Sequence, residues 1–214
     1  MSRRLLVISA GLSEPSATRL LADQLADCVR TQVSARGEEV AVDVLELREL
    51  AHDLATATTS GGVPTPALAA AHDLVTAADG LVAVTPVFSA SYSGLFKLFV
   101  DTLDPDAVNG MPVLIGATAG TPRHSLVLDH AMRPLFTYLR AVVVPTGVFA
   151  ATEDFGDAGL EERIRRAASE LAGQMVGAGE GVAGLPPGPA RERRSGTTLP
   201  DPPSFEDLLR GHSG

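Results

Sequence analysis

Short apolar runs alternate with longer amphipathic segments along most of this chain, and this alternation constrains the fold more than any other feature. Apolar runs of about 4–8 residues predict buried strands, and the amphipathic segments between them predict helices that cover a parallel sheet. The predicted strands are Arg4–Ser9, Val40–Leu45, Gly80–Thr85, Pro112–Ala117 and Val142–Val148. Five such units with short connections predict an α/β fold, a doubly wound five-stranded parallel sheet with helices on both faces.

The amphipathic segments predict the helices of this fold. They run from about Ser16 to Gly37, over Pro66–Ala78, Gly94–Leu103 and His124–Ala141, and from Leu160 to about Val176. Pro134 interrupts the fourth helix, and we expect a kink or bulge there because proline lacks a backbone donor and clashes with the preceding turn. The strand Gly80–Thr85 is uniformly apolar and is expected at the centre of the sheet. The Gly/Thr/Pro-rich segment Thr56–Pro64 is expected to be a mobile loop.

Charge and hydropathy exclude several classes of protein. The chain has 17 basic and 26 acidic side chains, a net charge of −9, and no Lys/Arg-rich run, so nucleic acid is not expected as a partner. No apolar stretch approaches the ~18 residues that span a membrane. Leu5–Ile8 is too short for a signal peptide, so a soluble, cytoplasmic protein is expected. The single cysteine, Cys28, excludes an intrachain disulfide and a Cys-rich metal site, and its helical surroundings favour core packing over a redox role.

The composition changes near the end of the last predicted helix. Residues 1–176 are predicted to form one domain, and residues 177–214 form a tail rich in Gly, Pro, Arg and Ser. The apolar spacing of Phe205–Leu209 would suit a short docked helix at 204–210. A disordered tail and a tail that docks onto a subunit are both compatible with this composition.

Three loops follow the strands at the edge where ligands bind in sheets of this kind. The loop Ser9–Thr18 is rich in hydroxyls and ends at a helix N-terminus, an arrangement that favours a phosphate, although Ser16 could simply cap the helix. No GxGxxG pattern of a dinucleotide-binding fold follows the first strand, and the chain has no GxxxxGK[ST] of a P-loop.

The two other loops offer different chemistry. Thr85–Gly94 combines Phe88 and Tyr92 with small hydroxyl side chains, which suits a flat ring with polar edges, unless the aromatic rings pack inward and the serines only cap the next helix. In Ala117–Ser125, Gly120 permits close approach of a ligand to the main chain. His124 could be a general acid or base, a stacking residue or a surface residue.

Three stretches of the chain resemble the NAD(P)H-dependent FMN reductases of flavodoxin-like fold. They are most similar to the alkanesulfonate-type reductases of two-component flavin monooxygenase systems and their actinobacterial relatives. The stretches are SAGLSEPSATRLLAD, DGLVAVTPVFSASYSGLFKLFVDTLD and GATAGTPRHSLVLDHAMRPLFTYLRAVVVPTGVFA, and the resemblance covers about residues 3–175. It implies the strand order 2-1-3-4-5, with FMN and NAD(P)H as cofactors.

The resemblance also implies which residues hold FMN. Its phosphate would lie among Ser9, Leu12, Ser16 and Thr18, its ribityl chain and ring along Pro86, Val87, Phe88 and Ser89, and its polar edge against Thr118, Ala119 and Gly120. His124 is assigned to binding, and no catalytic side chain is expected, because hydride passes directly between stacked rings. Many relatives carry an arginine in the first loop, whereas this chain has none before Arg19. Amides and hydroxyls would therefore hold the phosphate loosely.

The implied activity is hydride transfer from NAD(P)H to flavin N5, followed by release of reduced FMN to a partner monooxygenase. Two alternatives fit the same loops: a reductase of quinones, azo dyes or metal oxyanions that retains FMN, and a non-enzymatic flavodoxin-like electron carrier. Relatives form homodimers or homotetramers, and the family can carry a π-bulge at a subunit interface near the position of His130. A role of His130 in assembly is a hypothesis on this basis, and Pro134 offers a simpler reason for a bulge.

Overall fold

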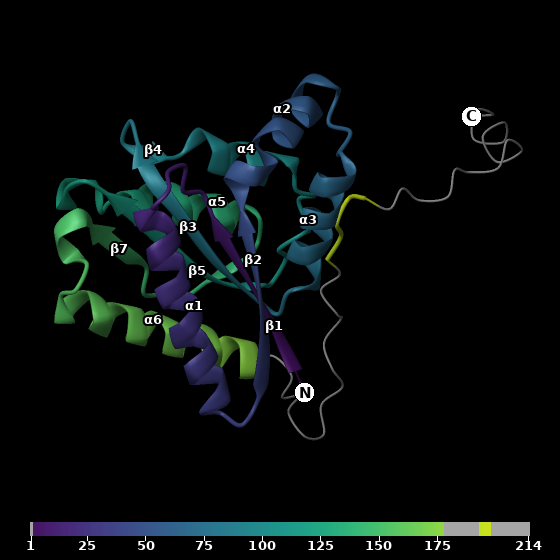
Figure 1. Ribbon diagram of the computed structural model, residues 1–214. Helices are drawn as coiled ribbons and strands as arrows, with labels where there is room; N and C mark the ends of the chain where they lie inside the picture. Colours follow the sequence, from purple (N-terminus) through teal and green to yellow (C-terminus); the bar gives the residue numbers. More distant parts are fainter. Residues whose placement is uncertain (1, 178–192, 198–214) are drawn as a thin grey trace, which may run out of the picture.

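The computed structural model describes residues 2–177 and 193–197, and these form a parallel sheet between two layers of helices (Figure 1). The strand order is β2-β1-β3-β5-β6, and β7 also pairs with β5. The strands are β1 (Ser2–Ser9), β2 (Glu39–Glu46), β3 (Gly80–Phe88), β5 (Pro112–Ala119), β6 (Val142–Val143) and β7 (Val148–Ala151). The short β4 (Ser91–Tyr92) pairs antiparallel with β3 and forms a hairpin. Apart from this hairpin, the predicted doubly wound parallel sheet and its order are confirmed.

The helices cover the sheet on both faces. On one face α1 (Ala17–Ser34) and α6 (Ala158–Gly177) lie side by side (Figure 1). The other face carries α2 (Ala51–Thr59), α3 (Pro66–Ala77), α4 (Gly94–Thr102) and α5 (Arg133–Tyr138). Each face has its own apolar cluster, because alternate residues of β1 and β3 point to opposite sides of the sheet. Cys28 packs at the edge of the α1–α6 cluster, and burial raises the pKa of its thiol.

The prediction of a mobile loop over Thr56–Pro64 is wrong for the first half of this segment. Thr56 to Thr59 form the last turn of α2, which continues from a 3₁₀ helix at Leu47–Leu50. Leu47, Leu50 and Leu54 are buried against the core, so their three- and four-residue spacing is the amphipathic signal that the Thr-rich composition concealed. The fifth predicted strand is also divided into β6 and β7, with Pro145 between them.

The segment predicted as one helix over His124–Ala141 has three parts. A 3₁₀ helix at Pro122–His124 is followed by a π-helical turn at Leu128–Met132 and then by α5. In the π-helical turn the backbone N–H of Arg133 donates to the carbonyl of Leu128, five residues earlier. The predicted bulge before Pro134 is therefore confirmed, and His130 lies within it.

Part of the tail lies against the domain. The guanidinium of Arg193 donates to the carbonyl oxygen of Ala78, and the Thr197 hydroxyl donates to the Asp73 carboxylate at 3.0 Å. The yellow segment in Figure 1 runs beside α3 at this place. The helix predicted at 204–210 lies outside the described residues, and the division at residue 176 remains a prediction. Among the described helices, none is long and apolar enough to cross a membrane.

A buried histidine makes the stability of this fold depend on pH. His72 on α3 is buried, with Nε2 3.0 Å from the Thr102 hydroxyl, and burial lowers its pKa more than nearby Asp73 raises it. Below the ordinary histidine pKa of about 6.5, the unfolded chain binds a proton that folded His72 does not. We therefore expect the free energy of unfolding to rise with pH between about 5 and 7.

Urea unfolding of His72→Gln at several pH values tests this origin of the slope. The substitution should remove most of the rise, because glutamine does not titrate. His52→Gln is the matched control, since His52 is exposed on α2 and its loss should leave the slope in place. An unchanged slope in His72→Gln would assign the pH dependence to other groups.

Candidate functional site

The carboxyl ends of three neighbouring strands bring the predicted binding loops to one edge of the sheet. In the parallel register, Ser9 lies opposite Val84, and Pro86 lies opposite Thr118. The first loop leaves β1 at Ser9, the second loop leaves β3, and the third leaves β5 at Ala119. Because the three strands are parallel neighbours, their carboxyl ends lie at the same edge of the sheet and their loops surround one space.

The first loop folds closely over the start of α1. The Ser16 hydroxyl accepts a hydrogen bond from the Arg19 amide at 3.2 Å, so Ser16 is the helix N-cap that one alternative predicted. A Cβ built at Gly11 would collide with the Ser16 hydroxyl, which explains the need for glycine there. Ser9 is 1% exposed, and its hydroxyl has no partner among the described residues.

A buried hydrogen bond joins the first and third loops. The Thr18 and Thr118 hydroxyls lie 2.8 Å apart, and both side chains are almost fully buried. Thr18 is in the first turn of α1, whereas Thr118 is near the end of β5, a hundred residues later. This contact fixes the distance between the helix N-terminus and the loop after β5.

The second loop is a tight hairpin anchored at its base. The Thr85 hydroxyl accepts from the Ser93 amide at 3.0 Å, and the Ser93 hydroxyl accepts from the Phe96 amide at 3.2 Å, which starts α4. At the tip, Ser89 and Ala90 have φ values of 49° and 67°. This left-handed backbone is strained for residues other than glycine and matches a two-residue turn between twisted strands.

The three loops, with the residue that follows β7, line an open cavity of about 420 Å³, which we call the cofactor hollow. Its lining residues are Leu12, Ser13, Ser16, Ala17, Thr18, Pro86, Val87, Phe88, Thr118, Ala119, Gly120 and Thr152. Among the predicted residues, the structure places three apart from it. Ser9 is buried, Ser89 is at the tip of the hairpin, and His124 lines a second cavity.

Sequence reasoning missed three of the lining residues. Ser13 and Ala17 lie within the predicted first loop but were not singled out, because the pattern did not show which side chains faced inward. Thr152 follows β7 directly, at the same edge of the sheet. The signal that could have found it is the fifth strand itself, whose carboxyl end is occupied by a hydroxyl side chain.

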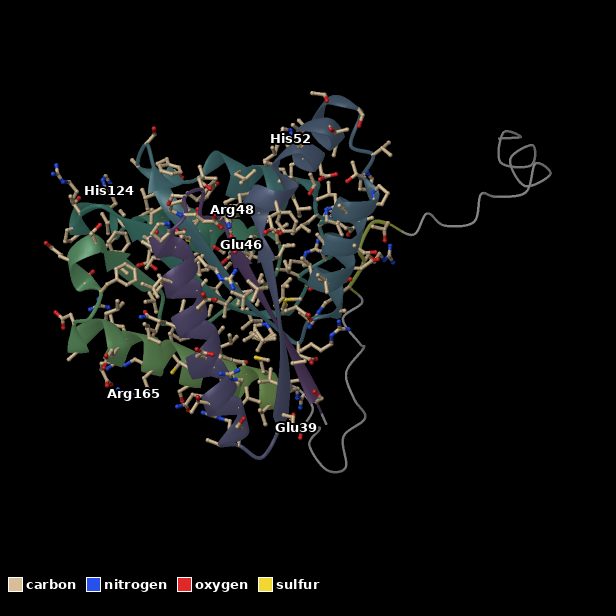
Figure 2. The ribbon with its side chains drawn as sticks, in the orientation of Figure 1. Glu39, Glu46, Arg48, His52, His124 and Arg165 are labelled. Atoms are coloured by element: carbon tan, nitrogen blue, oxygen red, sulfur yellow. The ribbon has the colours of Figure 1, made fainter. Side chains whose placement is uncertain are left out.

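The charges around the first loop are already paired. The Arg19 guanidinium donates to Asp23 at 2.8 Å and also to Glu46. Arg48 donates to Glu14, in the loop itself, and to Glu46 at 2.9 Å. Figure 2 shows Glu46 and Arg48 together, far from Glu39 at the other end of β2. Hydrogen bonding to carboxylates raises the pKa of both arginines.

The residues of the cofactor hollow fit FMN. The N-terminus of the 18-residue helix α1 and the hydroxyls of Ser13 and Ser16 suit a phosphate. The side chains of Leu12 and Phe88 are 53% and 49% exposed, which gives the rim apolar surface for a planar ring. No cluster of metal-ligating side chains occurs within residues 2–177 or 193–197.

Fold and site together define a flavin-nucleotide-binding α/β protein. The pattern of the NADPH-dependent FMN reductase family matches residues 3–156. The chain is 35% identical over 184 residues to an FMN reductase (NADPH) of Pseudomonas aeruginosa, covering 83% of this chain and 95% of the relative. It is 38% identical over 176 residues to the NADH-dependent FMN reductase SfnE of Pseudomonas putida, covering 80% and 91%. The chain belongs to the NADPH-dependent FMN reductase family and is an oxidoreductase that uses NAD(P)H and FMN.

Solved structures agree with this assignment. The crystal structure of an oxidoreductase from Corynebacterium diphtheriae superposes with a TM-score of 0.80 at 58% identity, covering 82% of this chain and 97% of that one. A flavodoxin, WrbA-like protein from Agrobacterium tumefaciens superposes with a TM-score of 0.58 at 14% identity, covering 82% and 98%, and so supports the flavodoxin-like fold.

A double-mutant cycle tests the contact between the first and third loops. Thr18→Val and Thr118→Val should each destabilise the protein by about 1–3 kcal/mol, because each leaves the other hydroxyl buried without a partner. The double variant should lose less than the sum, with a coupling of about 1 kcal/mol in urea unfolding. Strictly additive losses would show that the hydroxyls do not interact.

Proposed function

We propose that this FMN reductase binds FMN as an exchanging substrate and releases reduced FMN to a flavin-dependent monooxygenase. The observation that carries the proposal is the paired state of Arg19 and Arg48, the two cations beside the first loop. Carboxylates already engage both side chains, so the phosphate would be held by helix amides and hydroxyls. Without a free cation, its affinity is lower than a charge-assisted site would give.

The residues of the cofactor hollow act by positioning. None of the lining side chains titrates near neutral pH, so the hollow itself supplies no general acid or base. When bound, FMN supplies the acceptor for a hydride from nicotinamide. The main chain at Ala119 and Gly120, where a Cβ at Gly120 would meet open space, allows close approach of a ligand to backbone amides.

The rim of the hollow supports exchange. Leu12 and Phe88 stand about half exposed at opposite loops, so apolar surface is available without enclosing a ring on every side. A reductase that passes on its flavin needs such an opening twice, once for the nicotinamide and once for release of the product. The same opening would serve a reductase that retains FMN, so flavin retention is the property to measure.

Steady-state assays and gel filtration test the proposal together. We expect the protein to oxidise NADPH or NADH with added FMN, and bound flavin to separate from the protein on gel filtration. Reduced FMN should also support a flavin-dependent monooxygenase across a dialysis membrane that separates the two proteins. Flavin that stays with the protein through gel filtration, with no monooxygenase turnover across the membrane, would instead indicate the FMN-retaining alternative.

The variant Glu14→Gln tests why the affinity is low. Glu14 is exposed, carries a negative charge in the phosphate loop and occupies Arg48. Its neutralisation should remove a negative charge from the phosphate loop and leave Arg48 paired with Glu46 alone. FMN should then bind about two- to fivefold more tightly, because exposed ion pairs are worth about 0.2–1 kcal/mol. The gain should shrink at high salt. Fluorescence titration of FMN gives the dissociation constant.

Glu162→Gln is the matched control for this prediction. Glu162 pairs with Arg165 on α6, so its replacement changes the net charge equally without touching the first loop. It should leave the FMN dissociation constant unchanged. Equal affinities in Glu14→Gln, Glu162→Gln and the parent protein would mean that Glu14 and its ion pair with Arg48 do not limit phosphate binding.

A further inference from the structure

A second cavity lies next to the cofactor hollow and is lined by basic side chains. Its volume is about 450 Å³, and we call it the basic hollow. The lining residues are Ala90, Ser91, Arg123, His124, Leu126, Val127, His130 and Ala131. Figure 2 shows His124 at the edge of the molecule, well separated from Arg165 on α6. The cofactor hollow uses none of these side chains.

The basic hollow has basic but no acidic lining side chains, although the chain as a whole is acidic. The protein carries a net charge of −9, yet no Asp or Glu lines the basic hollow. The nearest acid along the helix, Asp129, accepts from Arg133 at 3.0 Å, and Arg133 also donates to the Val144 carbonyl. Within the described part of the chain, Arg123 has no ion pair. Its charge is therefore available to a ligand.

Local structure explains why these side chains share one cavity. The 3₁₀ helix Pro122–His124 carries the first two basic residues, and the π-helical turn Leu128–Met132 carries His130. In that turn Leu128 and Met132 are buried, whereas His130 is exposed and faces the cavity. The opposite wall is the hairpin, which contributes the hydroxyl of Ser91.

Both walls of the basic hollow continue those of the cofactor hollow. On the hairpin, Phe88 lines the cofactor hollow and Ala90 lines the basic hollow. After β5, Gly120 belongs to the first cavity and Arg123 to the second. A ligand with one planar end at the flavin and an anionic part beyond it could therefore follow both loops from one cavity into the other.

We propose that the basic hollow binds the phosphate groups of the nicotinamide dinucleotide, an inference that rests on the proposed binding of FMN in the neighbouring cofactor hollow. Arg123 supplies a planar guanidinium that matches two phosphate oxygens at once. His124 and His130 supply ring N–H donors on either side along the same segment. Leu126, which is 65% exposed, gives apolar surface for the ribose or the base.

In the basic hollow, His124 and His130 would bind the dinucleotide, which differs from the roles expected from the sequence. His124 was expected near the flavin but lies in the basic hollow. His130 was considered for subunit assembly, whereas in the described chain its imidazole lines the same cavity as Arg123. Dinucleotide binding by these residues would appear as a change in nucleotide affinity without a change in FMN affinity.

Kinetics of Arg123→Gln provide the first test. The KM for NADPH should rise about tenfold or more, since a charge-assisted hydrogen bond to phosphate is worth about 1.5–3 kcal/mol. The KM for FMN and the kcat should change little. Arg123→Lys should recover part of the loss, and Arg165→Gln, an exposed arginine on α6, should match the parent protein.

The two nucleotides distinguish which phosphate is bound. A rise in KM for NADPH alone assigns Arg123 to the 2′-phosphate, and an equal rise for NADPH and NADH assigns it to the pyrophosphate. Both outcomes support the proposal. Unchanged KM values for both nucleotides, or equal effects of Arg123→Gln and Arg165→Gln, would overturn it.

Direct binding provides a readout that does not need catalysis. Calorimetric titration with adenosine 2′,5′-bisphosphate and with ADP should show binding of at least one of them to the parent protein and to Arg165→Gln. Binding of that probe should weaken at least about tenfold in Arg123→Gln. Because Arg123 is exposed, an unchanged thermal unfolding curve should accompany this loss. If neither probe binds the parent protein, the basic hollow is not a nucleotide phosphate site, whereas absence of NAD(P)H oxidation alone would count against the proposed function.

Discussion

The in-register pairing of β3 between β1 and β5 is the constraint on which the rest of the structure depends. β3 is covered on both faces, so its side chains alternate between two apolar clusters. A shift of one residue would exchange these two sets and bring Thr85 out of its place beside Ser93. The hydrophobic pattern thus sets the register, and the parallel pairing places the three loops at one edge of the sheet.

With the three loops at one edge of the sheet, short polar side chains fix the distances between them. The Thr18 hydroxyl on α1 contacts the Thr118 hydroxyl on β5, and Thr85 holds the base of the hairpin through the Ser93 amide. Hydroxyls suit this task because they satisfy buried backbone and side-chain groups without the desolvation cost of a charge. The charged groups stay outside, where Arg19 and Arg48 are balanced by acidic neighbours. The cofactor hollow consequently has hydroxyl groups beside apolar surface, and no charged side chain lines it.

The sequence predicted much of this arrangement because regular patterns carried it. Alternation of apolar and amphipathic segments indicated the sheet, its central strand and the binding loops. It did not indicate α2, because threonines and the following glycines concealed the buried spacing of Leu47, Leu50 and Leu54. Nor could it separate His124 from the flavin loops, because the 3₁₀ helix that turns His124 into the second cavity depends on three-dimensional packing. The pairing of Arg48 with Glu14 was equally invisible, since 34 residues separate them.

The two hollows share the same supports, and this sharing has a mechanical consequence. On the hairpin, the strained backbone at Ser89 and Ala90 begins directly after Phe88, which lines the cofactor hollow, and includes Ala90, which lines the basic hollow. After β5, Thr121 lies between Gly120, which lines the cofactor hollow, and Arg123, which lines the basic hollow. The Thr121 hydroxyl is buried without a partner among the described residues. A rearrangement at either point would change both cavities together. Strain and an unpaired polar group therefore lie together at the border between the two hollows.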